Sequence, residues 1–295
     1  MPGSASQGAL LNFGLSALPC PQLATRHVQA AKRSLLYTAA VRSTPLPIML
    51  IVWLRLVAAV MYSMMVTAPQ VLPAGTALPV EVGATLSAKN ARAGQKIEGR
   101  LMQEVRLPSG FVIKKGSRIS GKIISVQRPS GITLRFDQLQ DEHQAIPLNV
   151  SLRAIADSAS VFQAALPVDA STSEASDEWV TQQIGGDYVF RGRGYVSSDQ
   201  GQVGRWTGTG VWGKLGPGGD CIDSDDNGDE QALWIFSGTA CGAYGFQDLT
   251  IAKSGRTPPV GEITLRSSKQ ALVRGGGGWL LVVNSAAIGA VNRKQ

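Results

Sequence analysis

The part of the sequence richest in possible metal ligands is the acidic stretch 223–230. Its oxygen-bearing side chains stand at alternate positions, a spacing typical of the opening of a calcium loop, in which hard oxygens converge around a turn. The candidate ligands are Asp223, Asp225, Asn227 and Asp229. The twelfth position from Asp223 is Trp234, whereas an EF-hand closes on a bidentate Glu. A solvated acidic turn is therefore the alternative to calcium, and no other cofactor is expected.

Two cysteines flank this stretch closely enough to form a disulfide. Cys221 and Cys241 lie twenty positions apart, and a bridge closing a loop of that length stabilises a fold by about 3 kcal/mol. Such a bridge forms in an oxidising compartment. A catalytic thiol would instead need an imidazole base, and the sequence holds only His27 and His143. We therefore predict a Cys221–Cys241 disulfide.

No catalytic residue can be assigned from motifs. His143 follows two acidic residues in what reads as a hairpin tip, and no G-x-S-x-G motif accompanies it. Carboxylate-pair hydrolysis stays open, because spacing in the sequence does not reveal spacing in the fold. A groove with two acids facing exposed tryptophans would favour a carbohydrate site, whereas tryptophans in a β domain more often form its core. The tryptophans in question are Trp206, Trp212, Trp234 and Trp279.

A glycine motif at 208–214 has the letters of a phosphate-binding loop without its context. The run matches G-x-x-x-x-G-K, but Leu215 follows the lysine where a Ser or Thr is needed for magnesium. Three further glycines and a proline at 216–219 prevent the helix whose N-terminus would hold the phosphate. We therefore expect no nucleotide site.

The positive charge of the chain is concentrated near its beginning. The formal net charge is +7, but residues 1–80 contain five basic residues and no acidic one. The rest has 23 basic and 21 acidic residues, too even a balance for a surface that neutralises phosphates. No nucleic-acid partner is therefore expected.

An apolar segment at 46–68 predicts a signal peptide or a membrane anchor. Residues 46–66 are long enough to span a bilayer, but Arg55 would lie near the middle of the span, where a charge costs about 3 kcal/mol. If translation starts at Met49 rather than Met1, Arg55 ends a short basic region that precedes an apolar run of ordinary signal-peptide length. Cleavage near Ala68 or a little later, an uncut anchor and a buried helix are the alternatives.

These features predict where the protein resides. Residues 1–45 show no sustained period, so we expect disorder or a mis-assigned N-terminal extension. The expected location is periplasmic, secreted, or membrane-anchored facing the periplasm, with membrane contact through residues 46–66 if they are not cleaved.

The remaining sequence predicts an all-β fold in two segments. Glycine supplies 34 of 295 residues and charged residues only 17%, which favours turns and strands. Short alternating strands over 80–155 predict a small β barrel or sandwich, with Gly116 supplying a tight turn and Gly121 a close strand crossing. Residues 156–183 read as a linker, 184–285 as a Gly-rich β domain containing the disulfide, and 286–295 as a tail.

The first β segment also resembles a known family. The runs Gln103 to Gly121, Leu134 to Leu139 and Ala145 to Leu148 are similar to the β module in the periplasmic part of TrbI-type conjugal transfer scaffolds. Uncharacterised exported bacterial proteins carry a similar module alone. The resemblance implies a bacterial envelope location and a non-catalytic assembly role.

The function expected from the sequence is that of an exported bacterial cell-envelope protein with a non-catalytic binding or assembly role. Its partner would be an envelope protein or a polysaccharide. Two alternatives stay open. One is a secreted carbohydrate-binding or carboxylate-dependent hydrolase domain, and the other is a component of a type IV secretion or conjugation scaffold.

Overall fold

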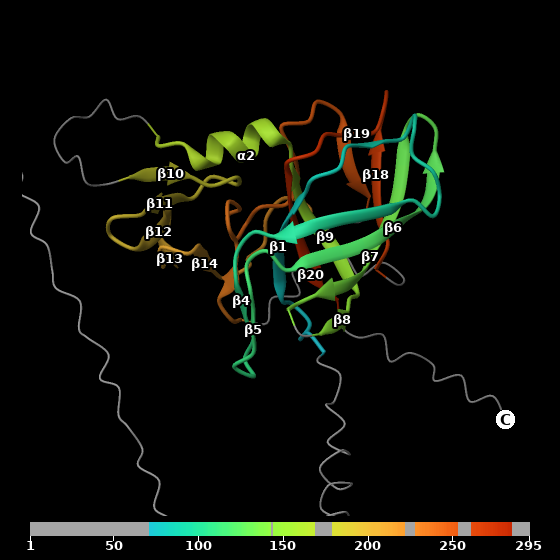
Figure 1. Cartoon of the computed structure of the whole chain (residues 1–295). Coiled ribbons are helices and arrows are strands. Elements are labelled where there is room, and N and C mark those ends of the chain that lie inside the picture. The colour runs from blue at the N-terminus through green and yellow to red at the C-terminus, as the bar shows by residue number, and fades with distance from the viewer. Residues whose placement is uncertain (1–70, 143, 169–178, 222–227, 253–260, 285–295) are drawn as a thin grey trace, which may run out of the picture. The chain divides into compact units, whose positions relative to one another are not determined.

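The structure is a computed structural model, which describes residues 71–142, 144–168, 179–221, 228–252 and 261–284. All of them belong to one compact unit, Thr67–Gln295. The described part is mostly β, which confirms the predicted all-β class at that level (Figure 1). The predicted leader at 46–68 lies outside the described residues. Among those that are described, no helix is long and apolar enough to cross a membrane.

The larger of two main sheets has ten strands and curls into a nearly closed barrel (Figure 1). Nine of its strands follow the order β16-β9-β20-β1-β3-β6-β7-β18-β17, and β8 pairs with β7. Their bounds are β1 Ala77–Val82, β3 Lys96–Leu101, β6 Arg118–Gln127, β7 Gly131–Gln140, β8 Ala145–Pro147, β9 Val150–Ala156, β16 Gly242–Tyr244, β17 Leu249–Ala252, β18 Ile263–Ser267 and β20 Gly277–Val283.

Alternation along the strands builds the core of this barrel. In β3 every second residue is buried, so Ile97 and Leu101 face inward while Lys96 and Glu98 stay in solvent. Trp279 of β20 is fully buried inside and meets Phe136 of β7 edge to face, with ring centroids 5.9 Å apart. This edge-to-face contact is the preferred aromatic geometry and fills the barrel centre.

Two short two-stranded sheets accompany the barrel. One pairs β2 (Leu86–Ser87) with β19 (Leu272–Val273), and the other pairs β4 (Val105–Arg106) with β5 (Val112–Ile113). In the turn between β5 and β6, Gly116 has φ of 90°, a conformation that favours glycine. Gly121 lies at a register shift between β6 and β7, where a Cβ would come 2.0 Å from the Arg135 carbonyl oxygen.

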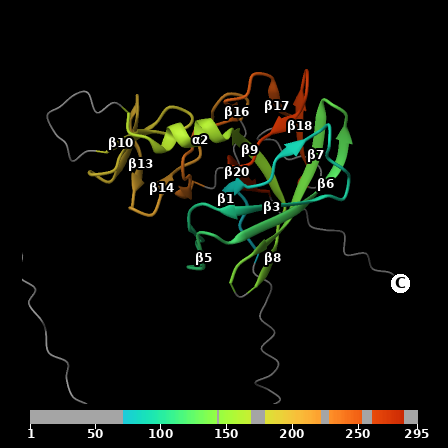
Figure 2. The same ribbon diagram turned by 45° about the horizontal axis from the view of Figure 1, so that its top comes forward.

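The second main sheet has six strands in simple sequence order from β10 to β15. It is inserted between β9 and β16, and α2 (Ser158–Ala165) leads into it. Figure 2 shows α2 between this sheet and the barrel, in agreement with its contacts to β10 and β20. The strands are β10 Val180–Gln182, β11 Tyr188–Phe190, β12 Tyr195–Ser198, β13 Gly201–Trp206, β14 Val211–Gly213 and β15 Gln231–Ala232.

A second core joins the six-stranded sheet to the outside of the barrel. Along β20, Trp279 and Leu281 point into the barrel, while Leu280 and Val282 point outward into this second cluster. The outward residues belong to the same apolar cluster as Val189 and Val211 of the inserted sheet. Both faces of β20 are therefore buried, which explains why the strand is a continuous apolar run.

The structure groups the strands differently from the two successive segments expected from the sequence. β16, β18 and β20 come from the later segment, yet they pair with strands of the earlier one, and β17 extends the sheet beyond β18. Residues 156–183, expected as a linker, contain α2 and β10 in their described part. Alternation reveals which face of a strand is buried but not which strand it pairs with, so the sequence could not reveal this closure.

Candidate functional site

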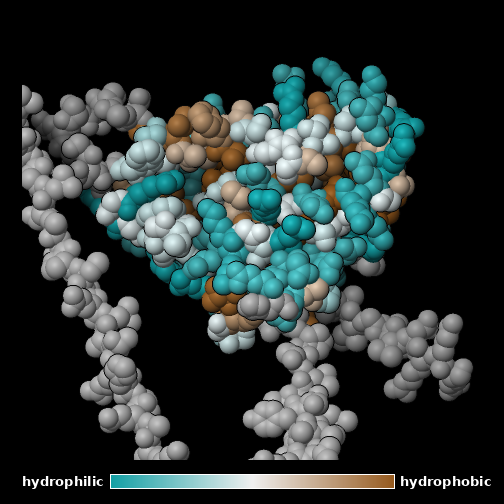
Figure 3. Space-filling model, in the orientation of Figure 1, coloured by the Kyte–Doolittle hydropathy of each residue, from teal (hydrophilic) through white to brown (hydrophobic). Residues whose placement is uncertain are grey.

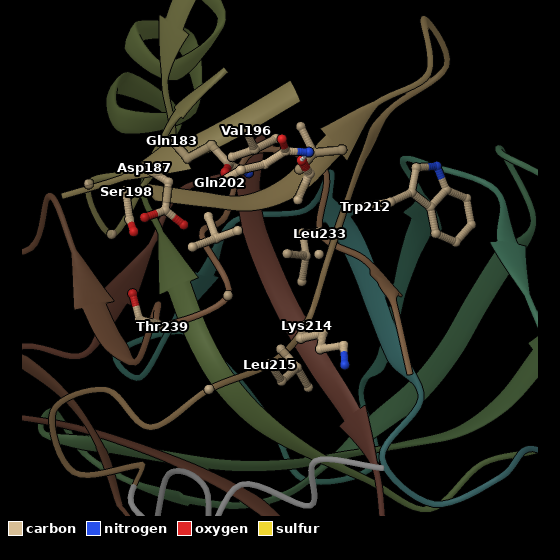
Figure 4. A pocket seen from close by; sticks show the side chains of 18 of the residues that line it. Gln183, Asp187, Val196, Ser198, Gln202, Trp212, Lys214, Leu215, Leu233 and Thr239 are labelled. Carbon is tan, nitrogen blue, oxygen red and sulfur yellow. Dashed lines mark hydrogen bonds between the residues drawn. The ribbon is translucent and has the colours of Figure 1, made fainter. Parts of the chain in front are cut away.

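A cavity of about 780 Å³ lies against the six-stranded sheet (Figure 4). Its wall consists of the turn 183–187, residues of β12 to β14, and the loops at 214–216 and 238–239. Small-molecule sites commonly measure ~300–1,000 Å³, so this cavity has the size of a ligand site.

The turn at 183–187 connects β10 to β11 and forms one end of the cavity. The Gln183 N–H donates to the Asp187 carbonyl oxygen at 2.7 Å, and Gly185 and Gly186 both have φ near 110°. Residues other than glycine rarely adopt this backbone conformation. A Cβ on Gly185 would also lie 2.0 Å from the Ser237 hydroxyl oxygen. The two glycines thus allow the turn to pack directly on the loop that follows β15.

Asp187 is the buried carboxylate of the cavity, with only 7% of its surface exposed. Burial raises its pKa above the ordinary range, and the charge of Asp199 raises it further. The Gly238 N–H donates a hydrogen bond to the Asp187 carboxylate, which lowers the pKa but does not reverse the shift. Asp187 and Asp199 therefore line the same cavity, and Asp187 is held in a desolvated position.

Gln183 adds an unpaired acceptor to the same turn. Its Nε2 donates to the Phe236 carbonyl oxygen, and the residue is 5% exposed. Its Oε1 has no hydrogen-bond partner among the described residues. Buried polar atoms are normally paired, so the turn holds one acceptor that a ligand donor could satisfy.

The other walls are apolar or internally neutralised. Val196, Leu215 and Leu233 supply buried apolar surface. Arg205 pairs with Glu230, with Nε and Oε2 2.6 Å apart. Its guanidinium also lies 5.5 Å from the Trp212 ring centroid, and the Trp212 side chain points away from the cavity (Figure 4).

Arg153 connects the barrel to the loops at 214–216 and 238–239, which form the floor of the cavity and are called the floor loops below. It lies in β9 at a register shift opposite β20 and is 2% exposed. Its guanidinium donates to three carbonyl oxygens, those of Gly216, Gly238 and Ala240. Two of these residues line the cavity. One barrel side chain therefore positions both floor loops.

The predicted disulfide is confirmed and holds the same loops. Cys221 and Cys241 have their sulfurs 1.98 Å apart and their Cα atoms 5.9 Å apart. The bridge ties the segment after Gly216 to the segment after Gly238. A Cβ on Gly218 would lie 1.8 Å from the Thr239 carbonyl oxygen, so the backbones meet closely beside the bridge. A disulfide of this kind indicates an oxidising environment.

Most of the predicted calcium ligands cannot be placed. Asp223, Asp225 and Asn227 lie outside the described residues, while Asp229 is exposed. Where the structure describes the chain, His, Cys, Asp and Glu side chains form no group of three or more that could hold a metal ion.

The other predicted candidates are dispersed. Residues 208–214 form the β13–β14 connection and β14 itself rather than a loop before a helix. Trp212 and Trp279 are buried, and His143 lies outside the described residues. Figure 3 shows apolar side chains gathered near α2, where Phe162 and Leu166 are 65% and 43% exposed.

Sequence reasoning missed the residues that build the cavity. Asp187, Gln183 and Arg153 belong to no motif, and Arg153 follows an alternating strand pattern in which it reads as solvent-facing. The available signal was Gln-Ile-Gly-Gly-Asp at 183–187, a glycine turn that presents polar side chains.

A comparison with known protein families, with curated proteins and with solved structures finds no match to this chain.

Proposed function

We propose that the chain is an exported bacterial cell-envelope protein that acts by binding, without catalysis, and that the cavity beside the six-stranded sheet is its ligand site. The observation that carries the proposal is a cavity of about 780 Å³ with a buried carboxylate, whose floor loops are cross-linked by a disulfide. A pre-formed site of this kind reduces the ordering that accompanies ligand binding.

The disulfide and the apolar segment at 46–68 both favour an exported location. Cys221 and Cys241 stay bridged in an oxidising compartment, and the apolar segment at 46–68 would deliver the chain there. An envelope polysaccharide or an envelope protein would be the source of the ligand.

Export is tested by fusing β-lactamase to the C-terminus of the full chain in a bacterial host. We expect ampicillin resistance from the full chain and none from a matched fusion that begins at residue 70. The intact mass of the secreted protein should rise by two hydrogens on reduction. A fully reduced, cytosolic chain that confers no resistance would overturn the proposal.

A carboxylate-dependent hydrolase is the second candidate, favoured by Asp187 and Asp199 lining the same cavity. In such an enzyme a carboxyl of raised pKa serves as general acid. Release of reducing sugar from purified envelope polysaccharide, lost in Asp187→Asn, would support it. The absence of any release by the wild-type protein would leave binding as the activity.

A further inference from the structure

The end of the cavity formed by the turn 183–187 has negative charge that no basic side chain of the described residues neutralises. Arg205 and Glu230 neutralise each other, which leaves Asp187, Asp199 and Lys214 as the other charged lining residues. No Lys or Arg of the described chain forms an ion pair with Asp187 or Asp199.

Figure 4 shows how these groups are distributed. The oxygens of Asp187, Ser198 and Thr239 lie on one side of the cavity, and the Lys214 nitrogen lies on the other. Gln183, with its unpaired Oε1, belongs to the turn on the acidic side. The acidic side therefore offers hydrogen-bond acceptors and negative charge.

A carboxylate in such a position requires compensation. Burying an ionised carboxyl is unfavourable unless it is paired or hydrogen-bonded, and Asp187 accepts the Gly238 N–H without a basic partner in the described chain. A ligand cation would provide the missing charge. A primary ammonium has three donors and no acceptor, which matches this set of acceptors.

The neighbouring walls define the rest of the ligand. Leu215 and Leu233 also line the cavity and are 1% and 2% exposed, with Leu215 next to Lys214 (Figure 4). A chain of methylene groups would pack against them and bury apolar surface.

We infer that the cavity binds a small amine, with its primary ammonium at Asp187 and Asp199 and its aliphatic carbons against Leu215 and Leu233. This inference rests on the proposed function, because it assumes that the cavity is a ligand site.

The test is isothermal titration calorimetry on the full-length, disulfide-bonded protein. The probes are 1,5-diaminopentane, its neutral counterpart 1,5-pentanediol, glucosamine and glucose. We expect the diamine to bind at least tenfold more tightly than the diol. Stronger binding of glucosamine than of both diaminopentane and glucose would identify an amino sugar as the source of the same ammonium.

Substitutions of the two acids test whether the diamine binds in the cavity. Asp187→Asn and Asp199→Asn should each weaken diamine binding tenfold or more. Asp199 is exposed, so its variant keeps the test valid if Asp187→Asn does not fold. The matched control, Asp137→Asn, removes an exposed acid from β7 of the barrel and should leave binding unchanged.

The outcomes separate this inference from the function on which it rests. Equal binding of diol and diamine, insensitive to both variants, would overturn the ammonium site and leave the cavity as a ligand site. Binding of glucose alone would do the same. If none of the four probes binds while the β-lactamase fusion is exported, the ammonium site is overturned and export stands.

Discussion

The barrel and the inserted six-stranded sheet contrast in what stabilises them. Barrel strands reach ten residues in β6 and β7, and they enclose a continuous apolar core. The inserted strands have two to six residues. Their connections rely on positive-φ glycines such as Gly185 and Gly194, on the disulfide and on Arg153.

Within one compact unit, the barrel provides a packed scaffold and the insert provides the cavity. Side-chain packing around a continuous apolar core stabilises the barrel. Backbone contacts and cross-links stabilise the insert, which leaves room for a cavity beside its sheet. Binding residues often lie on loops that a rigid scaffold positions, and here the barrel provides the scaffold through Arg153.

The largest expected effect tests packing in the barrel. Trp279→Ala removes the buried ring that contacts Phe136, and we expect the free energy of unfolding to fall by about 4 kcal/mol. Urea unfolding followed by circular dichroism measures it. The control is Trp179→Ala, because Trp179 is 52% exposed. Equal losses in the two variants would contradict the assignment of Trp279 to the core.

The next effect tests the link between barrel and insert. Arg153→Met removes the donor for three carbonyl oxygens, and we expect a loss of about 3 kcal/mol because each buried, unpaired group costs about 1–3 kcal/mol. Hydrogen exchange should accelerate at 214–216 and 238–240 before it does in β6 and β7. Arg118→Met, at an exposed position, is the matched control. Uniform acceleration throughout the chain would refute a local role.

Loss of the disulfide should lower the stability of the unit and loosen the insert first. In Cys221→Ser/Cys241→Ser the denatured chain regains its freedom, which lowers stability by about 3 kcal/mol. Limited proteolysis should then cleave between residues 214 and 241 while the barrel resists. Cleavage that begins in the barrel strands would contradict this order.

The smallest effect is a pH dependence at Asp187. Its pKa is raised in the folded protein, so the folded state holds the proton more tightly than the unfolded state. The contribution of Asp187 to stability is present below its unfolded pKa and is lost as the pH rises through the folded pKa. As the pH rises from 3 to 7, the stability of Asp187→Asn relative to the wild type should therefore increase in urea unfolding. A relative loss over that range would reverse the sign and contradict the raised pKa.

Local patterns predicted a large part of the fold. The alternation at Ile132, Leu134 and Phe136 predicts a buried strand face, which the barrel core confirms. The apolar run at 232–236 has the composition of one strand, but Trp234 has φ of 53° and the strand ends at Ala232. Such an interruption depends on tertiary contacts, here the hydrogen bond from Trp234 N–H to the buried Gln103 side chain.

The candidate site was predictable only in part. Cys221 and Cys241 were identified because a covalent bridge needs only two cysteines in a suitable compartment. Asp187 could not be distinguished from other acids, because the turn that holds it packs on Ser237 and Gly238, which follow it by about fifty positions. The acidic stretch at 223–230 is recognisable by its composition, whereas the cavity is built from residues scattered along the chain.

The sequence by itself determined the β class and the cysteine pair, since alternation and residue type are local properties. Only the tertiary structure decided that late strands close an early barrel, that Arg153 points to the loops of the insert, and that Asp187 is enclosed in a cavity. Strand pairing and burial depend on contacts between residues far apart in the chain, and short-range patterns do not encode them.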